Sequence, residues 1–276
     1  MADSRKLLFT DLDATLLSSD KTVSEGNLRA IGEMVRLGHK FVLASGRPLL
    51  SVLKIAGRYG WDAPGYYISS YNGGLVYDCG QKKDILVHSL ALRDALFILS
   101  EAHKAGLHAH TYDREHVVSL YDTPELNRYI KGIAMPKLVI NDLNSHFAAD
   151  PPIKAIVISY EGKERLSAFQ KSVRKYTDGR LSHTFSNPNF LEYAHILSSK
   201  GASLTFLADF LGIPMENTIA CGDEENDLSM IEAAGLGVVM QNGTEAVKSY
   251  ADYITTADND HDGIAEVIRR FILQAG

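Results

Sequence analysis

The chain has 276 residues, of which 45% are hydrophobic and 22% charged, and its formal net charge is -6. This length predicts one large or two medium domains, and the composition is typical of a soluble globular protein. The acidic balance gives no reason to expect nucleic acid or an anionic membrane as a partner. Two distant cysteines and a polar start without a signal-peptide pattern predict a cytoplasmic protein.

The first apolar run begins at Leu7 and ends in two acids, Asp11 and Asp13. Residues two apart share one face of a strand, and a buried carboxylate is costly unless a cation or a chemical role offsets its desolvation. We therefore expect a buried strand whose carboxyl end opens onto a site, where open α/β sheets bind their ligands. A solvated acidic pair is the more common explanation of such a motif taken alone. The functional interpretation makes Asp11 a nucleophile and Asp13 a general acid and base.

The next segments alternate between helical and strand-like patterns. Ser24 is a candidate N-cap for the first helix, which Gly38 ends. Two strands follow, one ending at Ser45 and Gly46, the other just before Asn72. A hydroxyl and free backbone N–H groups at a helix start suit phosphate, although an ordinary cap or turn would explain each motif as well. The expected elements are helices over 24–38 and 49–59 and strands over 40–44 and 66–69.

The pattern changes near residue 81, where strands and helices no longer alternate regularly. This segment predicts an α+β module inserted into the first domain. His108 and His110 alternate on one strand-like run with Tyr112, and we interpret them as surface or interior of this module rather than as a metal site. The expected elements are helices over 93–105 and 163–176 and strands over 108–112, 116–120 and 153–159.

The alternating pattern returns near residue 190. A helix begins at Lys200, and a buried strand over 218–221 leads into Gly222 and Asp223. We therefore predict an α/β fold, with a doubly wound, Rossmann-like parallel-sheet core interrupted by an α+β cap. The domain boundaries are predicted at 1–82 for the first part of the core, 83–189 for the cap and 190–276 for the second part.

The loop after this strand carries the strongest signal. It holds the acids Asp223, Glu224, Glu225 and Asp227 around Asn226, which would repel one another without a cation. Oxygen ligands of this kind suit Mg²⁺. An acidic first helical turn explains the two glutamates, which we assign to solvent, but not an acid at the exit of the strand. Lys200 sits unfavourably at the positive end of a helix dipole, so it is either a surface lysine or a cation held for a phosphoryl group.

The order of these motifs resembles that of the haloacid dehalogenase superfamily, in particular its Cof-like sugar-phosphate phosphatases with a large inserted cap. The resemblance covers nearly the whole chain. It implies that Asp11 attacks phosphorus, that Asp13 is the acid and base, and that Mg²⁺ is the cofactor. The matching residues are Asp11, Asp13 and Thr15 in the first motif, Ser45 with Gly46 in the second, Lys200 in the third, Gly222, Asp223, Asn226 and Asp227 in the fourth, and Asn72 in a turn that faces substrate. The resemblance assigns Asp11, Asp13, Asp223 and Asp227 to the metal and Ser45, Gly46, Lys200, Asn226 and Asn72 to phosphate or substrate.

One departure from the family concerns Ala14, where relatives usually carry glycine. A positive φ angle at this alanine would make it a site of strain.

The sequence thus predicts a Mg²⁺-dependent phosphatase that hydrolyses small phosphomonoesters through a phospho-aspartyl intermediate. A dehalogenase would have no use for Asp13. A phosphomutase or phosphotransferase would use the same residues, and a non-catalytic phosphate-binding protein remains a further alternative. The sequence names neither the substrate, which the cap would select, nor the oligomeric state.

Overall fold

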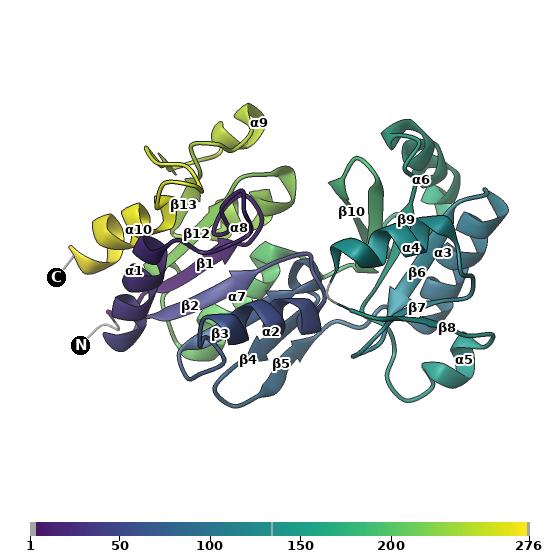
Figure 1. Ribbon diagram of the computed structural model, residues 1–276, viewed down its shortest axis with the longest axis horizontal. Coiled ribbons are helices and arrows are strands. Elements are labelled where there is room, and N and C mark those ends of the chain that lie inside the picture. Colours follow the sequence, from purple (N-terminus) through teal and green to yellow (C-terminus); the bar gives the residue numbers. More distant parts are fainter. Residues whose placement is uncertain (1–3, 134, 275–276) are drawn as a thin grey trace.

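The computed structural model describes residues 4–133 and 135–274. They form two lobes joined by two chain crossings (Figure 1). One lobe is built on an eight-stranded sheet of order β14-β13-β12-β1-β2-β3-β4-β5, in which all pairs from β14 to β3 are parallel. The predicted α/β class with a doubly wound parallel core is confirmed. The strands of this core sheet are β1 (Leu7–Asp11), β2 (Lys40–Ala44), β3 (Tyr66–Ser70), β4 (Leu75–Asp78), β5 (Lys83–Val87), β12 (Thr218–Gly222), β13 (Leu236–Val239) and β14 (Tyr253–Ile254).

Helices cover both faces of the core sheet because its strands are apolar on both sides. In β1, Leu8 packs into the cluster formed with α1, α2 and α10, whereas Leu7 and Phe9 pack into the cluster formed with α7 and α8. As predicted, Ser24 caps α1, and its hydroxyl accepts a hydrogen bond from the Asn27 N–H. The core helices are α1 (Glu25–Arg36), α2 (Leu49–Arg58), α7 (Lys200–Leu211), α8 (Leu228–Ala233), α9 (Glu245–Lys248) and α10 (Gly263–Ile268).

The cap is a six-stranded sheet of order β10-β11-β9-β6-β7-β8. Ala155 and Val157 of β9 belong to the cluster that α3 and α6 form, so these helices cover one face of the sheet. The alternate residues of β9, which include Lys154 and Ile156, occupy the opposite face. The cap elements are α3 (Leu92–Lys104), β6 (His108–Tyr112), β7 (Val117–Ser119), α4 (Pro124–Tyr129), β8 (Lys137–Val139), α5 (Leu143–His146), β9 (Lys154–Ile158), α6 (Lys163–Thr177), β10 (Leu181–Asn187) and β11 (Phe190–His195).

The domain boundaries differ from the predicted ones. β5 pairs with β4 in the core sheet, so the first crossing into the cap comes after Val87 rather than after residue 82. β11 pairs with β9 and β10 in the cap sheet, so the cap extends to His195 rather than to residue 189. The reason is hydrogen bonding, since a strand belongs to the sheet whose ladder it completes, and the sequence pattern does not reveal that partner. The outer limits at 1 and 276 lie outside the described residues.

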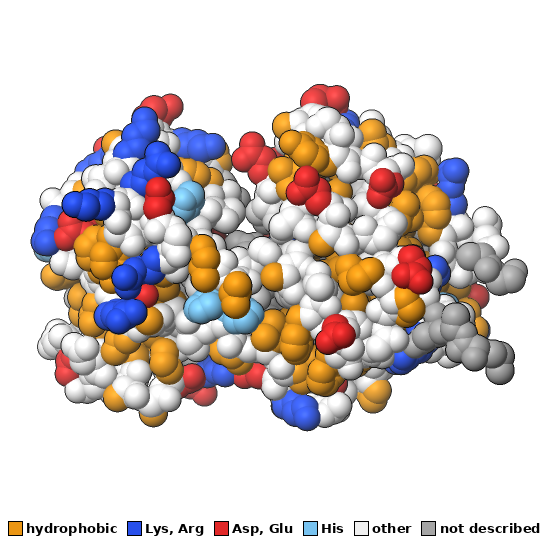
Figure 2. Space-filling view, turned by 180° about the vertical axis from the view of Figure 1, so that it is seen from behind, with side chains coloured by type: hydrophobic (Ala, Val, Ile, Leu, Met, Phe, Trp, Pro, Cys, Tyr) orange, Lys and Arg blue, Asp and Glu red, His pale blue; other side chains and the backbone are white. Residues whose placement is uncertain are grey.

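The topology places a crevice at the carboxyl end of β1. The chain runs outward from β1 to β2 and β3 on one side, and later to β12, β13 and β14 on the other, so the order reverses between β1 and β12. Ligands bind at such switch points. The space-filling view shows that the surface is hollowed between the two lobes (Figure 2). Among the described residues, no helix combines the length and the apolar character that crossing a membrane requires.

Candidate active site

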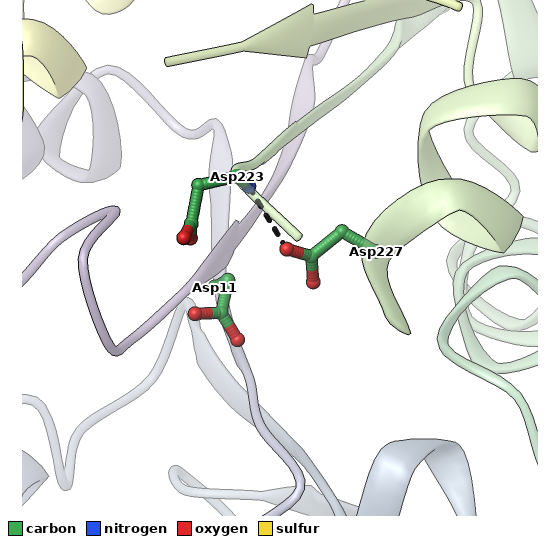
Figure 3. A group of neighbouring side chains, drawn as sticks. All are labelled: Asp11, Asp223 and Asp227. Atoms are coloured by element: carbon green, nitrogen blue, oxygen red, sulfur yellow. Dashed lines mark hydrogen bonds between the residues drawn. The ribbon is translucent and has the colours of Figure 1, made fainter. Parts of the chain in front are cut away.

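Three carboxylates meet at the switch point. Asp11 is the last residue of β1, Asp223 directly follows β12, and Asp227 lies one turn later (Figure 3). All three are buried, and each offers an oxygen within 4.8 Å of the others. The second oxygen of Asp227 accepts a hydrogen bond from the Asp223 N–H at 2.9 Å, which fixes the turn. Adjacent strands of one parallel sheet therefore bring together acids that are more than two hundred residues apart in sequence.

Lys200 is the cation that faces this group. Its ammonium is fully buried and donates to Asp11 Oδ1 and to Asp227 Oδ1, both at 2.5 Å. Burial opposes its charge, but the two carboxylates raise the pKa of Lys200 above its usual value. Lys200 is the first residue of α7, where the positive end of the helix dipole disfavours a cation. The two carboxylates offset this unfavourable interaction.

The three acids and one ammonium leave the site short of positive charge. Burial raises the pKa of Asp11, and the neighbouring carboxylates raise it further against the opposing charge of Lys200. Burial, with help from Asp227, raises the pKa of Asp223 to about 7, although Thr15 donates a hydrogen bond to it at 2.6 Å. Burial and mutual repulsion thus disfavour the ionised form of these carboxylates. A divalent cation such as Mg²⁺, which prefers hard oxygen ligands, would offset both effects.

Asp13 lines the same cavity as Asp11 and Asp223, but its carboxylate is not part of the clustered group. Arg47 binds it with two hydrogen bonds of 2.8 Å, and Lys21 adds a third at 3.1 Å. Burial opposes ionisation, but the hydrogen bonds and charges of Arg47 and Lys21 lower the pKa of Asp13. Arg47 was not among the predicted site residues, although its place directly after Ser45 and Gly46 was the available signal. The side chain of Asp13 is not one of the three clustered metal-ligand candidates; the backbone of this residue stays the predicted ligand.

The two predicted phosphate-binding loops touch each other. The Asn72 N–H donates to the Ser45 carbonyl at 3.0 Å, and Asn72 has a left-handed backbone with φ of 54°. A Cβ atom on Gly46 would lie only 3.1 Å from Asn72 Oδ1, so any larger residue here would push against the Asn72 side chain. That Asn72 oxygen is buried and has no hydrogen-bond donor among the described residues.

Ala14 has φ of 60°, the left-handed region that the family's glycine adopts freely. The condition stated for strain at this position, a positive φ, is therefore met. Its carbonyl accepts a hydrogen bond from Asn242 at 2.7 Å, which helps to hold the loop in this conformation.

A cavity of about 450 Å³ extends from these groups to the cap. Its core wall includes Asp11, Asp13, Ser45, Gly46, Asp223 and Asn226, and its cap wall includes Arg128, Tyr129, Lys154, Tyr160, Phe190 and Glu192. A neighbouring cavity of about 570 Å³ is lined by Asn72, Lys200 and, again, Asn226. The predicted residues thus line two neighbouring cavities that share Asn226, except Asp227, which lies in the buried group with Asp11 and Asp223. As predicted, Glu224 and Glu225 are exposed.

The cap supplies a buried ion pair that the sequence analysis missed. Lys154 donates to Glu192 at 2.8 Å, and it also reaches across to the Gly46 carbonyl of the core at 2.7 Å. Asn72 of the core donates in turn to Glu192 at 3.2 Å. The available signal was a single lysine at the head of the apolar run 153–158. It could not be interpreted without knowing which face of the cap sheet meets the core.

The comparison with known proteins now identifies the family. The haloacid dehalogenase-like hydrolase family model matches residues 8–268. The chain belongs to this family. The predicted resemblance is confirmed, and this haloacid dehalogenase-like chain is a hydrolase.

The matches to relatives extend over nearly the whole length of this chain. Phosphatase YwpJ of Bacillus subtilis (strain 168) is 29% identical over 297 residues, covering 97% of this chain and 100% of the relative. From the same strain, 5-amino-6-(5-phospho-D-ribitylamino)uracil phosphatase YitU is 27% identical over 283 residues, covering 96% and 97%. A crystal structure of a haloacid dehalogenase-like hydrolase from Bacteroides thetaiotaomicron is 32% identical, with a TM-score of 0.87 over 97% of this chain and 100% of that one.

Proposed function

We propose that this protein is a Mg²⁺-dependent phosphatase that hydrolyses small phosphomonoesters through a phospho-aspartyl intermediate on Asp11. The observation that carries the proposal is the position of Asp11. Its carboxylate ends the central strand, contacts Lys200 at 2.5 Å and opens into the cavity that Asp13 also lines. The phosphatases among its relatives support the same reaction class.

In the first step, an oxygen of Asp11 forms a bond to phosphorus while the bond from phosphorus to the ester oxygen breaks. The departing oxygen takes a proton from Asp13. In the second step, Asp13 accepts a proton from water, whose oxygen bonds to phosphorus as the aspartyl oxygen leaves. The ion pair with Arg47 lowers the pKa of Asp13 and so favours its ionised form, which is the form that accepts the proton from water in the second step.

The phosphoryl oxygens need positive charge and N–H or O–H donors where they face the carboxylates. Lys200, Ser45 and Asn226 are the residues we assign to them, with Asn72 facing the rest of the substrate. The acids Asp11, Asp223 and Asp227 would hold the Mg²⁺ ion, with the backbone carbonyl of Asp13. The ion would supply charge that offsets the repulsion between the carboxylates and a phosphate dianion.

The substrate is a small polar phosphomonoester of the sugar-phosphate kind, and its leaving group is the sugar-like alcohol. Lys154 and Glu192 offer hydrogen-bonding groups in the middle of the cavity, while Tyr129, Tyr160 and Phe190 offer apolar surface at its cap end. Because three relatives are named as phosphatases of a ribitylamino-uracil phosphate, phosphorylated polyols that carry a ring belong in the test beside simple sugar phosphates.

The test measures phosphate release from a panel of phosphomonoesters, with Mg²⁺ and with a chelator, for the wild type and for Asp11→Asn. We expect release that requires Mg²⁺ and disappears in the folded variant. Substantial release by Asp11→Asn would remove Asp11 as the nucleophile. Transfer of the phosphoryl group to a second sugar position, rather than to water, would favour the phosphomutase alternative. Binding of phosphate without any turnover would favour the non-catalytic alternative.

A further inference from the structure

A continuous line of hydrogen-bonded side chains runs through the cap. His108, His110 and Tyr112 alternate along β6, so they lie on one face of the cap sheet. His108 Nε2 lies 3.1 Å from His110 Nδ1, and His110 Nε2 lies 3.0 Å from the Tyr112 hydroxyl. At its ends, His108 Nδ1 lies 2.9 Å from the Thr123 hydroxyl, and the Tyr112 hydroxyl contacts that of Tyr129. We call these five residues the cap ladder.

The cap ladder joins two cavities. Tyr129 lines the cavity that contains Asp11 and Asp13. Thr123 and His108 line a separate cavity of about 420 Å³ within the cap. The three residues between the ends are buried, so water does not have free access to the middle of the ladder.

Every member of the ladder is electrically neutral near pH 7. Burial lowers the pKa of His108 to about 4, against a small opposing effect of Glu125. Burial, with the charges of His108 and Lys154, lowers the pKa of His110 well below its usual value. Burial raises the pKa of Tyr112 in turn. The ladder therefore carries protons as hydrogen-bond donors and holds no net charge.

Because every member is neutral, the donor direction of one hydrogen bond in the ladder determines the donor direction of all the others. A neutral imidazole has one N–H donor and one nitrogen acceptor, and a hydroxyl has one proton. Each internal member must therefore donate to one neighbour and accept from the other. Either every proton points toward Tyr129, or every proton points toward Thr123. A hydroxyl proton is thus available to one of the two cavities and not to the other.

The Thr123 end favours the first direction. Its hydroxyl oxygen accepts a hydrogen bond from the Leu126 N–H at 3.2 Å, as the N-cap of α4. Donating its proton to His108 Nδ1 then satisfies this hydroxyl completely. In the other direction the Thr123 proton would have no acceptor within the ladder and would point into the second cavity. With the protons running toward Tyr129, the Tyr129 hydroxyl accepts from Tyr112 and its own proton is left for the active-site cavity.

We propose that Tyr129 is a specificity-determining residue that donates a hydrogen bond to the leaving group of the substrate, and that the cap ladder fixes this donor direction. This inference rests on the proposed phosphatase function. The leaving group it selects carries an acceptor, such as a hydroxyl, carbonyl or ring-nitrogen atom, beyond the phosphate. His108, His110 and Tyr112 are positioning residues, because they act only through Tyr129.

Kinetics give the first test. Tyr129→Phe removes the hydroxyl and keeps the ring, and Tyr176→Phe is the control, because the Tyr176 hydroxyl donates to Asp94 of the cap and lies outside both the cavity and the ladder. For the ester that the wild type cleaves best, Tyr129→Phe should raise KM by roughly 3- to 10-fold, the effect of one hydrogen bond, with kcat nearly unchanged. Ethyl phosphate, which has no acceptor beyond the phosphate, should show no such change, and Tyr176→Phe should affect neither ester in this way.

The tautomers of the two histidines give the second test, which needs no turnover. ¹⁵N NMR of histidine-labelled protein should find His108 and His110 with the proton on Nε2. In Tyr129→Phe the Tyr112 proton loses its acceptor, so the ladder should reverse and both protons should move to Nδ1. Tyr176→Phe should leave both tautomers unchanged.

The outcomes separate this inference from the proposed function. Phosphate release that Tyr129→Phe does not alter, or alters equally for ethyl phosphate, would overturn the role of Tyr129 while the phosphatase function stands. Nδ1–H tautomers in the wild type, or tautomers that stay unchanged in Tyr129→Phe, would overturn the direction of the ladder. An absence of release from every ester by the wild type would instead refute the phosphatase function itself.

Discussion

The buried Lys154–Glu192 pair allows a quantitative prediction about the contact between cap and core. The Lys154 side chain is 2% exposed and that of Glu192 is 8% exposed, at an N–O distance of 2.8 Å. Lys154→Met would leave the Glu192 charge buried without its partner, and it would remove the hydrogen bond to the Gly46 carbonyl. Breaking one side of such a pair costs about 3–5 kcal/mol. We expect a loss of this size in the free energy of unfolding.

The double variant Lys154→Met with Glu192→Leu distinguishes charge burial from packing. With both charges gone, most of the lost stability should return, because an apolar replacement of a buried pair is often neutral or better. Phosphate release should stay impaired, since the link to the loop of Gly46 is still absent. The matched control is Arg165→Met, which breaks the exposed cap pair with Glu161 and should cost less than about 1 kcal/mol.

Urea unfolding followed by circular dichroism, together with phosphate release, measures both effects. A loss below about 1 kcal/mol in Lys154→Met would refute the reasoning, because the pair would then behave like the exposed one. A double variant as unstable as the single variant would show that packing, and not the unpaired charge, dominates.

Four further predictions concern the core loop, the metal, the second step and pH. Ala14→Gly should raise the free energy of unfolding by about 0.5–1 kcal/mol in urea titrations, because glycine relieves the left-handed strain but has more entropy in the unfolded chain; an unchanged or lower value would contradict this. Mg²⁺ at a hundred times its dissociation constant should stabilise the wild type by about 2.7 kcal/mol in thermal melts, and Asp223→Asn should remove most of this gain. Asp13→Asn should trap phosphate on Asp11, detectable by mass spectrometry as an added phosphoryl group, because an amide cannot activate water; normal turnover would refute the base role. Because the pKa of His108 is lowered to about 4 in the folded protein, the unfolded chain binds the extra proton below pH 6.5, so stability should fall by about 2 kcal/mol between pH 7 and pH 5 from this residue alone; a cap whose hydrogen-exchange protection is the same at both values would contradict it.

The sequence alone determined the class of fold and the family. The alternation of strands and helices predicts a parallel sheet, and parallel strands place their carboxyl ends at one edge. The acids and polar residues that end these strands, from Asp11 to Asp223, could therefore be assigned to one site before any coordinates. The sequence also marked Ala14 as a site of strain if its φ were positive, but only the structure shows that this φ is 60°.

Tertiary structure decided what depends on partners distant in sequence. Strand β11 belongs to the cap and β5 to the core because of the ladders they complete, and a strand pattern does not name its partner. Arg47 could be recognised as the partner of Asp13 only in the folded structure, which brings the loop after β2 against the loop after β1. The two histidines of β6 were correctly placed in the cap, but their line to Tyr129 depends on the packing of α4 against the sheet. Hydrogen bonds between side chains require positions within about 3 Å, and only packing sets distances that finely.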